Sequence, residues 1–216
     1  MIGSGKTRAA ADLACWLEER GEAARAYAEF AEDHPIRSDV VEQLRRSQAG
    51  ASNTGSAMPP AHPLGQWDLL AAQCRQGSQT VILESSFLQN AVLPRFADAA
   101  PAAEIRRVFD DIVARLAPAA PLLVYLRPHD IEAAIERIHR IRGAEWAAWN
   151  MAGVAAFPWA QRLDVTGRQA VVDFYRAWEP VVDRLWQAYP YPKRLVLDPQ
   201  RDRALALRQI TSALRA

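Results

Sequence analysis

Short apolar runs alternate with longer amphipathic stretches along this chain. Four runs have the length and composition of β-strands, namely 24–30, 81–83, 121–126 and 194–198. Apolar positions recur at helical spacing in the stretches 8–20, 64–76, 104–116, 131–141, 168–188 and 203–215. Strands that alternate with helices predict an α/β fold in which a parallel sheet has helices on both faces.

The alternation predicts one domain over residues 1–216, with a first strand apparently missing. The helix expected at 8–20 has no strand ahead of it, whereas a helical stretch follows each of the other strands. One more strand ahead of Ile2 would complete a three-layer fold, and we expect it in the centre of the sheet. Its loss would expose two strand edges.

The first residues carry most of a phosphate-binding pattern. Gly3-Ser4-Gly5-Lys6-Thr7 matches the second half of G-x-x-x-x-G-K-[ST] and precedes a predicted helix. In such a loop the backbone N–H groups surround phosphates, the lysine reaches the β/γ-phosphates and the hydroxyl residue binds Mg²⁺. The alternative interpretation is a flexible Gly/Ser turn ahead of a helix.

Acidic residues follow two of the predicted strands. Glu84 ends the apolar run 81–83, where a carboxylate needs a partner such as Mg²⁺ or a proton-donating acceptor. Because strand ends face the ligand crevice of open α/β sheets, Glu29, Asp33 and His34 are candidates for substrate contact. A solvated acidic turn is the alternative for 29–34, and an exposed glutamate that begins a loop is the alternative for Glu84.

Three arginines lie close together in the second half of the chain. Arg137 and Arg140 share a face of the helix expected at 131–141, and Arg142 follows them. Guanidinium groups in such a cluster suit bidentate contacts to phosphate, so a lid over about 137–145 is expected. A solvated basic face paired with nearby glutamates is the alternative.

Two further segments are distinctive in composition. Residues 48–63 are rich in Ala, Gly, Ser, Asn and Pro, which predicts a mobile loop that serves as a substrate lid or as an idle insertion. An aromatic helical segment covers 145–190. Its tryptophan-rich part, Trp146 to Trp159, lines either the acceptor site or a homodimer interface, or contributes to the core.

Charge and cysteine content exclude several classes of partner. Lys and Arg number 26 against 25 Asp and Glu, so no field for bulk nucleic acid is expected. Cys15 and Cys74 have no metal-ligand spacing and are interpreted as reduced, largely buried thiols of a cytoplasmic protein. The chain has neither an apolar run long enough for a membrane helix nor a signal peptide, so no membrane is expected as a partner.

The motifs together resemble those of P-loop small-molecule kinases of the deoxynucleoside kinase and thymidylate kinase group. The first, Gly3 to Thr7, is similar to that group's phosphate loop. The second, Leu83-Glu84-Ser85-Ser86, resembles its acidic motif at a strand end. The third, the strand that ends at Tyr125-Leu126-Arg127-Pro128 and the helix that follows to Gly143, looks like its strand, helix and lid. The likeness covers most of residues 1–143 and is only topological beyond them.

This resemblance implies transfer of the γ-phosphoryl group of ATP, with Mg²⁺, to a small-molecule acceptor such as a nucleoside or nucleotide. It implies nucleotide contacts from a set of residues at the loop and after the last strand: Gly3, Ser4, Gly5, Lys6, Thr7, Arg8 and Gln200. Thr7 and Glu84 would lie on the metal side, and Glu84 is alternatively the general base. One or more of Arg137, Arg140 and Arg142 would close over the transferring phosphate.

The chain departs from that group where an arginine usually follows the acidic residue, because Ser85 follows Glu84 and Arg95 is only a distant substitute. Residues that grip a nucleobase are not recognisable. A second hypothesis is therefore a nucleotide-binding or nucleotide-hydrolysing module that acts as a switch or binds a partner protein.

Overall fold

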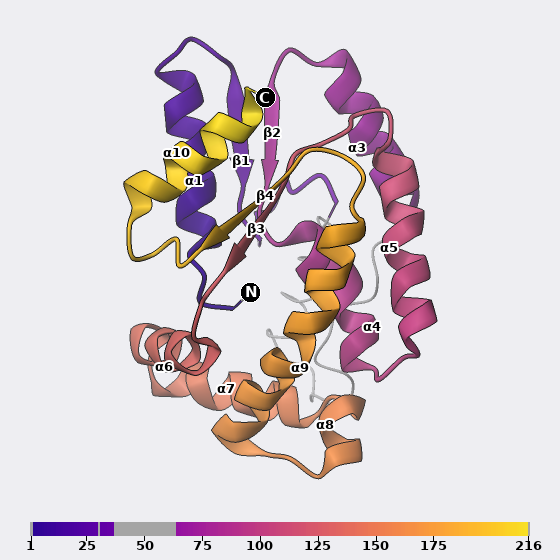
Figure 1. The fold of residues 1–216 in the computed structure, drawn as a ribbon, viewed down its shortest axis with the longest axis vertical. Coiled ribbons are helices and arrows are strands. Elements are labelled where there is room, and N and C mark those ends of the chain that lie inside the picture. Colours follow the sequence, from indigo (N-terminus) through magenta and orange to yellow (C-terminus); the bar gives the residue numbers. More distant parts are fainter. Residues whose placement is uncertain (1, 30, 37–63, 216) are drawn as a thin grey trace.

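The computed structural model describes residues 2–29, 31–36 and 64–215. Helices and strands alternate over these residues (Figure 1). The strands are β1 (Ala24–Tyr27), β2 (Thr80–Leu83), β3 (Leu123–Arg127) and β4 (Lys193–Leu197). The helices are α1 (Lys6–Glu18), α3 (Leu64–Gln76), the π-helix η1 (Ser86–Val92), α4 (Leu93–Ala97), α5 (Ala102–Leu116), α6 (Ile131–Arg142), α7 (Ala144–Ala155), α8 (Pro158–Leu163), α9 (Gly167–Ala188) and α10 (Arg203–Leu214). The loop expected at 48–63 lies outside the described residues.

The strands pair in parallel, as predicted, but they form two separate sheets rather than one. In the first sheet β1 pairs with β2, with Ala24 opposite Thr80. In the second sheet β3 pairs with β4, with Leu123 opposite Lys193. Among the described residues no ladder joins β2 to β3. The α/β class is therefore confirmed, whereas the expected continuous sheet is replaced by two pairs of strands.

Strand β2 differs from its prediction in burial. The continuous apolar run 81–83 predicted a strand covered on both faces, yet every residue of β2 is only half-buried. Strand β3 is also open at its beginning, because Leu123 and Val124 are half-buried while Tyr125 and Leu126 are buried. The physical reason is a cavity that both strands line. The prediction failed because it assumed a neighbouring strand on each side of β2.

Three apolar clusters hold the helices against the strands. One joins α1 and α10 to β1, β3 and β4 through residues such as Leu17 and Val196. A second joins α3 and α5 beside β2 around Trp67 and Ile112. The largest is built on α9 and includes Phe109, Ile135 and Phe174. In Figure 1, α6, α7 and α8 gather beyond the carboxyl ends of the strands, and the N-terminus lies near these same ends.

Several helix boundaries follow directly from side-chain chemistry. Asp130 caps α6, since its carboxylate accepts a hydrogen bond of 3.0 Å from the N–H of Ala133. Asp202 caps α10 in the same way through the N–H of Leu205 at 2.8 Å. Pro180 lies inside α9 without dividing it.

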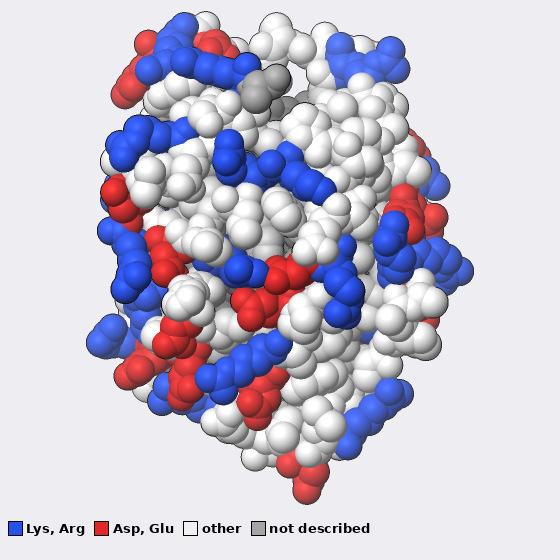
Figure 2. All heavy atoms as spheres, viewed as in Figure 1, with Lys and Arg blue, Asp and Glu red and all other residues white. Residues whose placement is uncertain are grey.

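Within the part of the chain that the structure describes, no helix has both the length and the apolar character that a membrane crossing requires. Both cysteines are free thiols, but Cys15 is exposed and Cys74 is half-buried, which corrects the expectation that both are largely buried. Figure 2 shows basic and acidic side chains interspersed over the face in view, without one continuous basic field.

Candidate active site

The loop from Gly3 to Gly5 leads directly into the first turn of α1. Gly3 and Gly5 have φ values of 63° and 77°, in the left-handed region that favours glycine. A Cβ atom on Gly3 would lie 2.8 Å from the carbonyl oxygen of Ala134, so the loop also passes too close to α6 for a larger residue. Gly5 is the N-cap and offers no side-chain cap, which leaves the N–H groups of the first turn directed toward the loop.

The loop is held by residues from two other parts of the chain. The carbonyl oxygen of Gly3 accepts a hydrogen bond from Arg137 of α6 at 3.3 Å. The same oxygen accepts a second hydrogen bond from the side-chain amide of Gln200, which follows β4. Arg137 and Gln200 therefore fix the loop from two distant parts of the sequence, and both were predicted to belong to the site.

Thr7 and Glu84, which the resemblance would place together on the metal side, are in direct contact. The Thr7 hydroxyl donates a hydrogen bond of 2.7 Å to Oε1 of Glu84, which lies immediately after β2 and is 7% exposed. The backbone N–H of Glu29 donates to the other carboxylate oxygen of Glu84 at 3.4 Å. A threonine hydroxyl beside a shielded carboxylate is an oxygen donor pair of the kind that Mg²⁺ binds while keeping waters and phosphate oxygens.

Lys6 lies between the two acidic strand ends. Burial lowers the pKa of Lys6 below its ordinary value of 10.5, and the charges of Glu29 and Glu84 oppose this effect by raising it. The lysine is therefore flanked by carboxylates from the ends of both β1 and β2. Such a position would let its ammonium group bridge the loop and the strand ends.

Glu29 contacts a residue that sequence reasoning missed. The side-chain amide of Gln89 donates to Oε1 of Glu29 at 3.3 Å. Tyr175 of α9 lies near the same carboxylate, because the charge of Glu29 adds to burial in raising the pKa of Tyr175 above its ordinary range. Gln89 and Tyr175, which lie near Glu29, line one large cavity together with Lys6 and Glu84.

The backbone changes direction sharply after Glu84. Ser85 has a φ of 60° in the left-handed region, which is strained for a residue other than glycine. It begins η1, a π-helix that places Gln89 toward Glu29. Such π-helical turns are rare and are frequent at functional sites. No periodicity in the sequence indicated it.

His34 is buried in a local hydrogen-bond network rather than directed at Lys6. Its Nδ1 accepts a hydrogen bond from the N–H of Ile36 at 3.2 Å, and its Nε2 lies 3.0 Å from the hydroxyl of Ser86. Ser86 in turn donates to the carbonyl oxygen of Glu84 at 3.0 Å. The histidine therefore supports the position of Glu84, and the predicted substrate contact stays a prediction.

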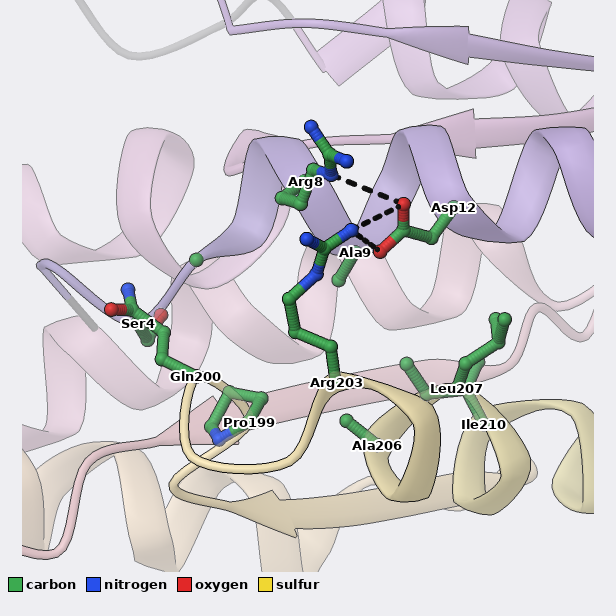
Figure 3. Close-up of a pocket in the computed structure, with 11 residues that line it drawn as sticks. Ser4, Arg8, Ala9, Asp12, Pro199, Gln200, Arg203, Ala206, Leu207 and Ile210 are labelled. Atoms are coloured by element: carbon green, nitrogen blue, oxygen red, sulfur yellow. Dashed lines mark hydrogen bonds and ion pairs between the residues drawn. The ribbon is translucent and has the colours of Figure 1, made fainter.

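A second cavity opens on the other side of the loop, next to the residues that follow the last strand. It has a volume of about 230 Å³ and lies between α1 and α10. Figure 3 shows Arg8 and Arg203 converging on Asp12, with ion pairs of 3.2 and 3.0 Å. Four of the seven residues expected to contact a nucleotide, Ser4, Gly5, Arg8 and Gln200, border this cavity, whereas Gly3, Lys6 and Thr7 do not. Asp12 and Arg203 were missed, because only the fold brings them together.

Other predicted residues lie apart from this arrangement. Asp33 is exposed and forms an ion pair with Arg25. Arg140 is exposed, and the guanidinium of Arg142 lies 5.9 Å from the ring centre of Trp146. Only Arg137 of the three lid arginines contacts the loop. Arg95 is engaged by Asp98 and Glu104 at 3.7 and 4.0 Å.

Among the described residues no group of three or more His, Cys, Asp or Glu side chains is placed to hold a metal ion. A cation at Thr7 and Glu84 would therefore take its remaining ligands from water and phosphate. No family model, curated protein or solved structure matches this chain. The interpretation of the site consequently depends on its geometry.

Proposed function

We propose that this protein is an ATP-dependent phosphotransferase that moves the γ-phosphoryl group of ATP to a small-molecule acceptor. The observation that carries the proposal is the convergence of Lys6 and the hydrogen-bonded pair of Thr7 and Glu84 at the glycine loop. Glycines in the left-handed region, a lysine and a hydroxyl residue at a helix start are the parts that phosphate binding needs.

The residues present fit ATP and Mg²⁺. The N–H groups at the start of α1 and the ammonium group of Lys6 would bind phosphate oxygens, and Thr7 and Glu84 would hold Mg²⁺. Arg8 and Gln200 border the 230 Å³ cavity between α1 and α10, which would receive the base. Bound ATP would supply the phosphoryl group and its metal would neutralise the developing charge.

The acceptor would enter on the side of Glu29. Because Glu84 is engaged by Thr7, it suits the metal side, and Glu29 is better placed to accept the proton of an acceptor hydroxyl. Gln89 would orient Glu29 through their 3.3 Å contact, while Asp33 and His34 would flank the entry. Arg137 already reaches the loop, and Arg140 and Arg142 would need to move to close over the phosphate.

Isothermal calorimetry with Mg²⁺ and ATP tests the proposal. We expect binding by the unmodified chain and none by Lys6→Ala, because no other described residue places an amine at the loop. Lys6→Arg serves as a charge-conserving variant, and Arg184→Ala, which removes an exposed arginine of α9, serves as a control. Equal binding by Lys6→Ala and the unmodified chain would contradict the proposal.

An acceptor screen then separates the two classes of function. Release of ADP that depends on an added hydroxyl compound, and that falls with Glu29→Gln, would support a kinase. Release that is independent of every acceptor and unaffected by Glu29→Gln would instead support the nucleotide-hydrolysing switch or partner-binding module.

A further inference from the structure

The two sheets face each other across a cavity of about 590 Å³. All of β2 and all of β3 except Arg127 line it. Apolar residues of α1, α9 and α10, among them Leu13, Val182 and Ile210, form much of its remaining wall, and Lys6, Glu84 and Gln89 line it as well. Strands therefore bound the cavity on two sides and helices bound it on other sides. A strand inside a sheet that is covered by helices has the same surroundings.

The backbone of β2 directs unused hydrogen-bonding groups into this cavity. The N–H groups of Thr80 and Glu84 donate to the carbonyl oxygens of Ala23 and Tyr27, next to and in β1. Since N–H groups in a strand alternate between its two sides, those of Val81 and Leu83 point away from β1. Both residues line the cavity, and β2 pairs only with β1 among the described residues.

The same argument applies to β3. The N–H of Leu123 donates to Pro192, and the carbonyl oxygen of Arg127 accepts from Asp198, so these residues face β4 and the turn after it. Val124 and Leu126 therefore point away from β4, and both line the cavity. Two rows of backbone groups thus face the same cavity from opposite sides. An extended segment between them would satisfy both rows, which a small ligand could not do.

The two sheets also agree in direction. Glu84 after β2 meets Thr7, and Gln200 after β4 meets Gly3, so both carboxyl edges converge on the same loop. A strand that ran parallel to β2 and β3 would end at that loop. Ile2 lies there, packed against the largest apolar cluster, and α1 covers the cavity immediately after it.

We propose that the cavity between β2 and β3 is the binding site for an additional parallel β-strand, formed by an extended apolar segment joined ahead of residue 1. The segment is apolar on both faces, because α1 and α10 cover one side and α9 the other. Its N–H and C=O groups pair with Val81 and Leu83 on one edge and with Val124 and Leu126 on the other. It joins the two sheets into one.

Hydrogen exchange tests the strand proposal without any nucleotide. A failure of the strand proposal can therefore be distinguished from a failure of the phosphotransfer proposal. The chain is compared with and without an extension of valine and isoleucine as long as β3 (5 residues) followed by one glycine. We expect exchange to slow by about 100-fold or more at the amides of Val81, Leu83, Val124 and Leu126. The amides of Ile82 and Tyr125 already face β1 and β4, so they are internal controls that change much less.

A matched extension with proline at alternate positions provides the control, because proline cannot donate to a ladder. We expect it to give no protection and no rise in the thermal midpoint, whereas the apolar extension raises the midpoint by roughly 10 °C. Equal effects of the two extensions would overturn the proposal. Protection at β1 or β4 in place of the cavity-facing amides would overturn it too.

A crosslinking measurement covers the case in which an extended chain aggregates. In a Cys15→Ser, Cys74→Ser background, a cysteine in the middle of the extension is combined with Val124→Cys or with Arg25→Cys. Neighbouring strands bring Cα atoms within the range that a disulfide needs. Crosslinking within one chain to position 124 and not to position 25 supports the proposal, and crosslinking to neither or to both alike overturns it.

Discussion

Replacing Thr7 with valine isolates the contact that joins the loop to the end of β2. Valine keeps the shape of threonine and removes the hydroxyl that donates 2.7 Å to Glu84. Glu84 is only 7% exposed, so water replaces the lost donor poorly. Thr7 is itself exposed, which keeps the expected loss at the low end of the range. We therefore expect a loss of about 1.5 kcal/mol in the free energy of unfolding, the low end for hydrogen bonds to charged groups.

Urea unfolding of a double-mutant cycle measures this contact directly. The cycle contains Thr7→Val, Glu84→Gln and both changes together, so the other contacts of Glu84 cancel from the coupling energy. We expect a coupling of about 1 kcal/mol, and Thr7→Val alone should lower the melting temperature by roughly 3–6 °C. Thr7→Ser retains the hydroxyl and should stay within about 0.5 kcal/mol of the unmodified chain. A coupling near zero would refute the reasoning.

Three other changes have defined outcomes. Ser85→Gly should stabilise the fold by about 1 kcal/mol, because glycine tolerates the φ of 60°, while Ser85→Ala should bring no gain in urea unfolding. The pKa of Lys6 in the folded protein is lowered from 10.5. Between that lowered pKa and 10.5 the unfolded chain therefore binds more protons than the folded chain does, and the free energy of unfolding should rise with pH through that window. Lys6→Met should flatten this slope in thermal melts below pH 9.0, the ordinary pKa of cysteine. Above pH 9.0 the raised pKa of Cys74 acts in the opposite direction, and above pH 10.0 the raised pKa of Tyr175 does so too. Arg137→Ala should lower the phosphotransfer rate on the order of 100-fold, because Arg137 contacts the loop. Arg140 is exposed and away from the loop, so Arg140→Ala should leave the rate in the same steady-state assay within about 3-fold, and a loss as large as that of Arg137→Ala would show that Arg140 closes over the phosphate during turnover.

The sequence predicted those parts of the fold that depend on local patterns. The helix at Leu64–Gln76 has the predicted boundaries because its amphipathic pattern is followed by Gly77. The helix expected at 131–141 is α6, Ile131–Arg142, because its apolar repeat begins directly after the capping Asp130 and ends before Gly143. The position of Glu84 at a strand end was also predictable, because an apolar run stops there.

The rest depends on contacts between distant residues. Nothing local distinguishes Arg137, which reaches Gly3, from Arg140, which is exposed. The approach of Gln89 to Glu29 requires a π-helix, which has no sequence period of its own. Strand β2 is half-buried because it borders the cavity between the two sheets. An apolar run in the sequence does not show which part of the fold will lie beside it.

The attachment of Gly3 to Gln200 has a consequence for the order in which a ribosome-bound chain can acquire structure. Domains emerge from synthesis with the N-terminal part first, yet the loop near the start is held by a residue near the end. Arg203 adds a second tie to Asp12 in the first helix. The nascent chain therefore carries its glycine loop and first helix without these two ties until Gln200 and Arg203 have been made, so both contacts form only after residues 1–199 have been synthesised.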